Sequence, residues 1–102
     1  MNDPTETPKG GAPAPAPYRS TRVFDERTLP EALRREHRTK AGTWGLICVL
    51  EGELLLRFLA PPSETLLTPE RPGIVLPEQP HLVEPRGVVR VRIDFYDQLP
   101  TP

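Results

Sequence analysis

Apolar residues from Tyr18 onward fall into short segments separated by glycine and proline. The last of them, residues 88–96 (VVRVRIDFY), alternates between one face with Val89, Val91, Ile93 and Phe95 and another with Arg90, Arg92, Asp94 and Tyr96. A period of two is typical of a β-strand with one buried face. Short strands spaced by turn signals predict an all-β fold, either an antiparallel sandwich or a small barrel.

Two apolar segments, residues 46–50 (LICVL) and 54–59 (LLLRFL), flank Glu51-Gly52, which predicts a tight hairpin with Leu50 opposite Glu53. Both faces of that hairpin are largely apolar: one carries Leu46, Cys48, Leu50 and Leu55, and the other Ile47, Val49, Leu54, Leu56 and Phe58. A domain this small has one interior, so the second face is expected to pack on another subunit or on the N-terminal segment. The pattern predicts a homodimer through this central hairpin sheet.

Residues 28–37 (TLPEALRREH) carry a mixed signal. Thr28 and Glu31 have the spacing of a capping box, which favours a short helical turn. Leu33, Arg35 and His37 would instead share one face of a strand. We expect a turn first, and then a strand that carries His37.

Composition narrows the classes of partner. The chain has 102 residues and a formal net charge of −1, without the basic excess of nucleic-acid-binding proteins. It has no run of membrane-spanning length and no signal-peptide pattern, so no membrane association is expected. The single cysteine, Cys48, cannot form an internal disulfide. A cytoplasmic location is expected.

Domain organisation follows from the prolines. Residues 1–17 hold five prolines and almost no large apolar side chains, which predicts a disordered tail. Residues 18–97 form the expected domain, and residues 98–102 are expected to be frayed.

Two histidines are the main candidates for chemistry. His37 precedes the loop RTKAGTWG, and His81 follows the apolar segment GIVL and a proline-rich loop. Two histidines at strand–loop junctions of a β-barrel can meet at its mouth, where such folds hold metals and small ligands. Neutral imidazole binds zinc, iron and nickel, and two histidines supply half of a tetrahedral site. The alternative is that each histidine is a hydrogen-bonded structural residue.

Other side chains are candidates for an additional ligand or a pocket wall. Glu78 lies in the loop before His81, and Asp94 is either a surface partner of Arg92 or faces a polar cavity. Trp44 would line a pocket or pack in the core. Arg35 and Lys40 flank His37 in sequence and could hold a small anion. Cys48 is expected to be an inert core residue.

Longer stretches resemble a known family. Residues 18–58 (YRSTRVFDERTLPEALRREHRTKAGTWGLICVLEGELLLRF), 73–85 (GIVLPEQPHLVEP) and 92–97 (RIDFYD) resemble the small TehB/YeaR-like domain. This domain occurs alone and as the N-terminal module of TehB-type tellurite-resistance methyltransferases. The resemblance implies a cupin-like double-stranded β-helix barrel, and it makes His37 and His81 motif positions.

The same resemblance implies an incomplete metal site. Cupins bind a divalent ion through histidines and a glutamate, but Gly45 stands where the motif has its glutamate, and the second histidine of that motif is absent. The implied ligand set is His37, His81, water and one acid. With no room for a methyltransferase domain, tellurite methylation by this chain alone is not expected.

The leading hypothesis is therefore a small stress-linked protein that binds a divalent metal ion (zinc, iron or nickel) or a small oxyanion or metabolite near His37 and His81. The competing hypothesis is a metal-free dimeric interaction or ligand-binding module without catalytic activity. The third hypothesis is an enzyme that acts on a small metabolite. It ranks last because the ligand set is incomplete and no catalytic residues stand out.

Overall fold

The computed structural model describes residues 16–101, so the tail expected over residues 1–17 lies almost wholly outside this range. The fold is all-β, as the alternation predicted. The elements in chain order are β1 (Arg19–Ser20), β2 (Phe24–Asp25), the 3-10 helix η1 (Glu31–Arg34), β3 (Trp44–Glu51), β4 (Leu54–Leu59), β5 (Pro62–Leu67), β6 (Gly73–Val75), β7 (His81–Pro85) and β8 (Arg90–Tyr96).

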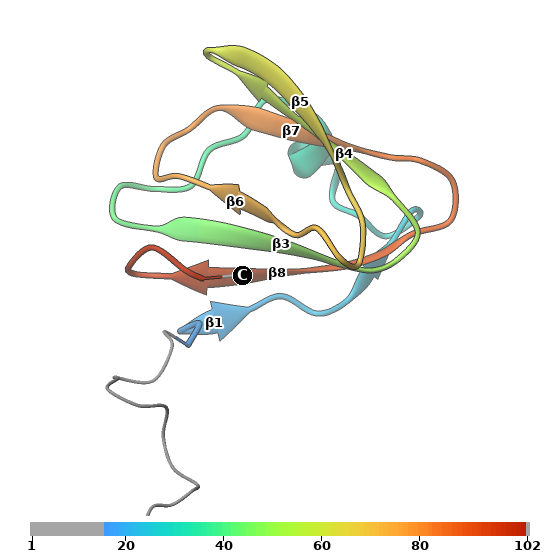
Figure 1. Ribbon diagram of the computed structural model, residues 1–102, viewed down its shortest axis with the longest axis horizontal. Coiled ribbons are helices and arrows are strands. Elements are labelled where there is room, and N and C mark those ends of the chain that lie inside the picture. The colour runs from blue at the N-terminus through green and yellow to red at the C-terminus, as the bar shows by residue number, and fades with distance from the viewer. Residues whose placement is uncertain (1–15, 102) are drawn as a thin grey trace, which may run out of the picture.

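The strands form two antiparallel sheets (Figure 1). One has the order β1-β8-β3-β6, with β2 also paired to β8, and the other has the order β5-β4-β7. The helix η1 lies against β7. Within residues 16–101 no strand of one sheet pairs with a strand of the other, so the expected closed barrel is not seen as a continuous ladder. The two sheets make a sandwich.

The core lies between the sheets and takes one face of β3, β4 and β8, together with single residues of β5, β6 and β7. In β8 the alternation holds as expected, since Val91 and Ile93 are buried in the core and Phe95 packs against it. The main buried members are Ile47, Val49, Leu54, Leu56, Leu67, Val75, Val83, Val89, Val91 and Ile93. This two-layer burial is the usual solution for sheets with one apolar face.

The predicted hairpin at Glu51-Gly52 is wrong. β3 pairs with β6 and β8, whereas β4 pairs with β5 and β7, so the two segments lie in opposite sheets. Gly52 has φ +83°, and a Cβ there would collide with the Val88 carbonyl oxygen. A glycine with positive φ serves a crossing between sheets as well as a hairpin, which is why the local signal misled.

Some apolar residues of β3 and β4 lie outside the core, and a hairpin between these two strands does not account for them. Leu46 on β3 and Leu55 on β4 are each buried, although they point away from the core. The chain after β8 turns back along β8 (Figure 1), and Pro100 is fully buried. Part of the segment that was expected to be frayed is therefore packed. The homodimer stays a prediction, but the hairpin sheet on which it rested is absent.

The mixed signal of residues 28–37 resolves into a turn without a strand. Glu31–Arg34 form η1, and His37 makes a single β-bridge rather than belonging to a strand. Leu29 and Leu33 turn inward, where Leu29 joins the core and Leu33 packs against it. In the part of the chain that is described, no helix has the length and apolar character needed to cross a membrane.

Candidate functional site

His37 and His81 lie directly opposite each other. The His37 N–H donates to the His81 carbonyl oxygen at 2.8 Å, and the His81 N–H donates to the His37 carbonyl oxygen at 2.9 Å. Directly opposed residues of an antiparallel pair project their side chains to the same face. Their ring centroids are 5.5 Å apart, with the planes at 77°. The two histidines therefore lie close together, as the sequence predicted. Their role as metal ligands stays a prediction.

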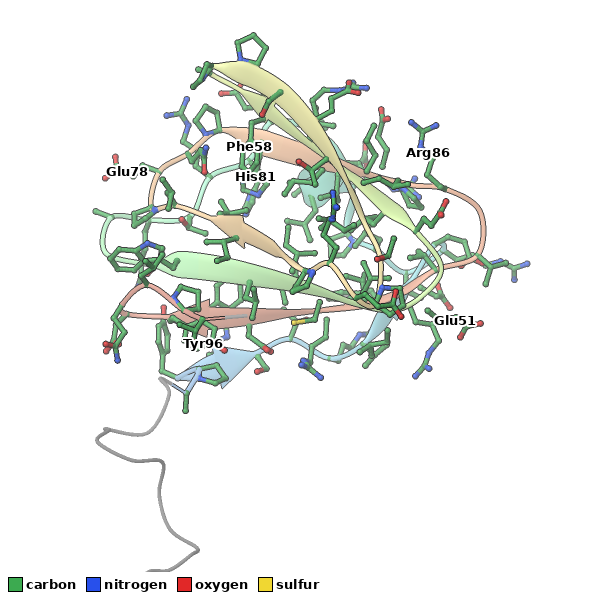
Figure 2. The ribbon with its side chains drawn as sticks, viewed as in Figure 1. Glu51, Phe58, Glu78, His81, Arg86 and Tyr96 are labelled. Atoms are coloured by element: carbon green, nitrogen blue, oxygen red, sulfur yellow. The ribbon has the colours of Figure 1, made fainter. Side chains whose placement is uncertain are left out.

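The His81 ring is buried, with 4% of the residue exposed. It lies beside Phe58, its partner across β4 and β7 (Figure 2). Its Nδ1 is 2.9 Å from the Gln79 carbonyl oxygen. Because a carbonyl can only accept, Nδ1 carries the proton and Nε2 holds a lone pair. No side chain or backbone group within residues 16–101 donates a hydrogen bond to Nε2.

Burial lowers the pKa of His81, and the nearby His37 lowers it further, although the bond to Gln79 acts in the opposite direction. The ring is therefore neutral near pH 7. A neutral imidazole that donates one ring N–H to a carbonyl and keeps the other nitrogen free has the form usual for a metal-ligating histidine.

The two rings border a small apolar cavity of about 30 Å³ between the sheets. Its polar lining consists of His37, His81 and Thr39, and the rest of the wall is mainly aliphatic, from Leu29, Leu33, Ile47, Leu54, Val75, Val83, Val91 and Ile93, with Gly45 and Phe95. A cavity of roughly 10–15 Å³ is enough for one water molecule. The cavity is therefore large enough for a water molecule or a metal ion beside the imidazole nitrogens.

The expected acidic ligands do not join this cavity. Asp94 lies on the opposite face of β8 from the cavity-lining Ile93 and Phe95, because successive residues of a strand point to opposite faces. Glu78 is exposed, and its side chain points outward at the end of the molecule (Figure 2). Throughout the described chain, no group of three or more His, Cys, Asp or Glu side chains is placed to hold a metal ion.

The remaining candidates also lie elsewhere. Trp44 shares the outer face of β3 with Leu46, because its neighbour Gly45 lines the cavity. Arg35 and Lys40 are exposed and do not line the cavity. The pocket role of Trp44 and the anion-binding role of the two cations therefore find no support in this geometry.

Asp94 belongs to a separate polar cluster on the outer face. It pairs with Arg92 at 2.9 Å, as one reading of the sequence had it, and it accepts hydrogen bonds from Ser20 at 2.7 Å and the Cys48 thiol at 3.7 Å. It is nevertheless buried, with 5% exposed. Burial raises the pKa of Asp94, but the bonds from Arg92 and Ser20 and the Arg92 charge outweigh it, and the net shift is downward.

The family model of the TehB-like domain matches residues 19–93. The chain belongs to the TehB-like family. Among solved structures, TehB from Haemophilus influenzae has a TM-score of 0.73 at 29% identity, covering 81% of this chain and 31% of that chain. A protein from E. coli strain K12 has a TM-score of 0.73 at 21% identity over 89% of this chain and 98% of that one, a likeness of fold alone. No curated protein matches the sequence significantly.

This TehB-like domain thus spans about a third of the H. influenzae TehB chain. Its Gly45, where the resemblance to cupins implied a missing glutamate, lines the cavity beside the histidines. A Cβ on Gly45 would meet the Thr39 Cγ2 and Val75 Cβ atoms at 3.8 Å, which is ordinary contact. A Cβ at this position would therefore fit beside the histidines, but Gly45 supplies no ligand of its own.

Sequence reasoning missed Gln79 and Thr39 in this TehB-like domain. Gln79 fixes the proton on the His81 ring through its backbone carbonyl, a role that no side-chain pattern signals. Thr39 lines the cavity and donates to the Thr43 carbonyl oxygen at 2.7 Å. Only the closeness of Gln79 to His81 in the motif PEQPH pointed toward it.

Proposed function

We propose that this TehB-like domain is a binding module that holds one divalent transition-metal ion between His37 and His81. The main observation behind this proposal is Nε2 of the buried residue His81, whose lone pair has no protein partner in the described region. Buried polar atoms in proteins nearly always have a partner, so an unpaired one calls for a bound ion, a water molecule or a ligand.

The spacing of the rings supports a shared ion. Two imidazoles that bind zinc at about 2.0–2.1 Å with a tetrahedral angle place their ring centroids roughly 5 Å apart. The observed 5.5 Å between the rings of His37 and His81 agrees with this. Imidazole suits zinc, iron and nickel better than magnesium or calcium, which prefer oxygen ligands.

Two protein donors leave the other coordination positions to water or a small ligand. Open positions favour reversible binding over a permanent structural role. A small oxyanion would bind to the ion itself, since Arg35 and Lys40 do not line the cavity. We assign the sandwich to the cupin-like double-stranded β-helix architecture, which holds metals between its two sheets, and we infer an accessory, stress-linked role.

The test is metal binding by the purified full chain, by elemental analysis and by titration calorimetry with zinc and nickel. The wild type is expected to bind one equivalent, and His37→Ala and His81→Ala are expected to weaken binding at least tenfold. Glu36→Ala is the matched control, because Glu36 neighbours His37 but is exposed and pairs with Arg38. Wild type that binds neither ion, or variants that bind as tightly as it does, would contradict the proposal and favour a metal-free module.

A further inference from the structure

The turn before His81 is unusually well tethered. It comprises residues 76–80 (LPEQP), and two hydrogen bonds join Gln79 to Leu76 at its start. The Gln79 N–H donates to the Leu76 carbonyl oxygen at 3.1 Å, and the Leu76 N–H donates back to the Gln79 side-chain Oε1 at 3.0 Å. One residue therefore closes the turn through its backbone and its side chain together.

Glu78 shows that this closure is imposed against a local preference. Its φ is +61°, in the left-handed region that only glycine enters freely. Its N–H donates to the Thr39 carbonyl oxygen at 3.0 Å, which ties the turn to the loop after His37. Strained backbone of this kind persists where surrounding bonds over-determine it, and it clusters near functional sites.

The same Gln79 makes the bond that sets the His81 proton. Its carbonyl oxygen accepts from Nδ1 at 2.9 Å, and the direction of that carbonyl depends on the turn. The turn therefore sets the hydrogen bond of the His81 ring, whereas the backbone of His81 is held by its bridge to His37.

We propose that Gln79 is a positioning residue, whose side chain locks the turn so that its own carbonyl keeps His81 protonated at Nδ1 and leaves Nε2 free toward the cavity. The arm of this proposal that concerns metal affinity rests on the function proposed above. The arm that concerns the proton on His81 stands without it. Outer partners of ligand histidines fix the tautomer in this way.

The decisive comparison is Gln79→Met against Gln79→Glu. Methionine has similar length but no oxygen for the Leu76 N–H, whereas glutamate retains an acceptor at that place. Gln98→Met is the matched control, because Gln98 is exposed and follows β8. The readout is the ¹⁵N shifts of the imidazole nitrogens at pH 8 in the metal-free protein, which report the tautomer.

Wild type, Gln79→Glu and Gln98→Met are expected to show His81 almost wholly as the Nδ1–H form, and Gln79→Met a mixture of both forms. In zinc titrations Gln79→Met is expected to bind roughly tenfold more weakly, the lower end of the loss typical for such partners. Should Gln79→Met fail to fold, Gln79→Asn, one methylene shorter, replaces it with the same expectations.

A variant that unfolds at a lower temperature but keeps the wild-type tautomer would overturn the proposal and leave Gln79 a structural residue. So would a wild-type His81 that carries its proton on Nε2. If the wild type binds no zinc while Gln79→Met still shows a mixture of tautomers, the metal function fails and the positioning role stands, so the two failures are distinguishable.

Discussion

His37 and His81 exchange both backbone hydrogen bonds, yet their side chains are unequally buried. His81 is 4% exposed and hydrogen-bonded, whereas His37 is half-buried. The pair thus joins a buried, hydrogen-bonded imidazole to a more accessible one. Such asymmetry suits a site that an ion enters from the His37 side.

This asymmetry predicts unequal costs of truncation. His81→Ala is expected to lower the free energy of unfolding by about 1–3 kcal/mol, since it removes a buried hydrogen bond. His37→Ala is expected to cost less than about 1 kcal/mol, as at partly exposed positions. Urea unfolding of metal-free protein measures both, and equal costs would contradict the asymmetry. Because His81 is buried, its stability cost alone cannot distinguish a ligand from a structural residue, and metal content must.

The lowered pKa of His81 predicts acid sensitivity. The unfolded chain takes up a proton near the ordinary value of 6.5, whereas the folded chain resists until a lower pH. Stability is therefore complete above about pH 6.5 and falls as the pH drops from there toward the folded pKa. Chemical denaturation between pH 8 and 5 measures this, with His81→Gln expected to flatten the slope. A variant that keeps the full slope would show that other groups cause it.

Substitution of Asp94 in the polar cluster on the outer face is expected to lower the stability of the protein without lowering its affinity for zinc. Asp94→Ala removes the acceptor shared by Arg92, Ser20 and Cys48, and is expected to cost about 1–3 kcal/mol. Because Asp94 faces away from the cavity, zinc affinity is expected to stay within twofold of wild type. Asp97→Ala, at an exposed position, is the control for charge. Loss of zinc binding in folded Asp94→Ala would restore Asp94 as a candidate ligand.

Gly87 and Gly52 both have positive φ, so alanine substitutions at the two positions form a matched comparison. Gly87 has φ +82° and nothing near the place of a Cβ, so Gly87→Ala is expected to cost about 1–2 kcal/mol for the backbone alone. Gly52 has φ +83°, but its Cβ would strike the Val88 carbonyl oxygen. Gly52→Ala is expected to cost about 1–3 kcal/mol more, as overpacking does. Equal melting temperatures for the two variants would mean that the crossing between sheets relaxes freely.

The all-β class and the face that β8 buries could be predicted from the sequence alone. These features depend on neighbouring residues: the period of two in residues 88–96 fixes which side chains share a face, and proline and glycine punctuate the strands wherever they fold. The nearness of His37 and His81 was predicted from a strand at His37 and a barrel mouth, whereas the structure brings the two residues together through a single β-bridge.

Which strands pair depends on contacts between residues far apart in the chain, and it became known only from the structure. The pattern around Glu51-Gly52 says that both flanking segments have apolar faces, but it does not say whether they pair with each other or cross to opposite sheets. Asp94 likewise became a buried member of an outer cluster only when Ser20, 74 residues away, came beside it. Alternation records the face of a residue, whereas long-range pairing sets its neighbours, and the His81 proton depends on a backbone carbonyl that no side-chain pattern encodes.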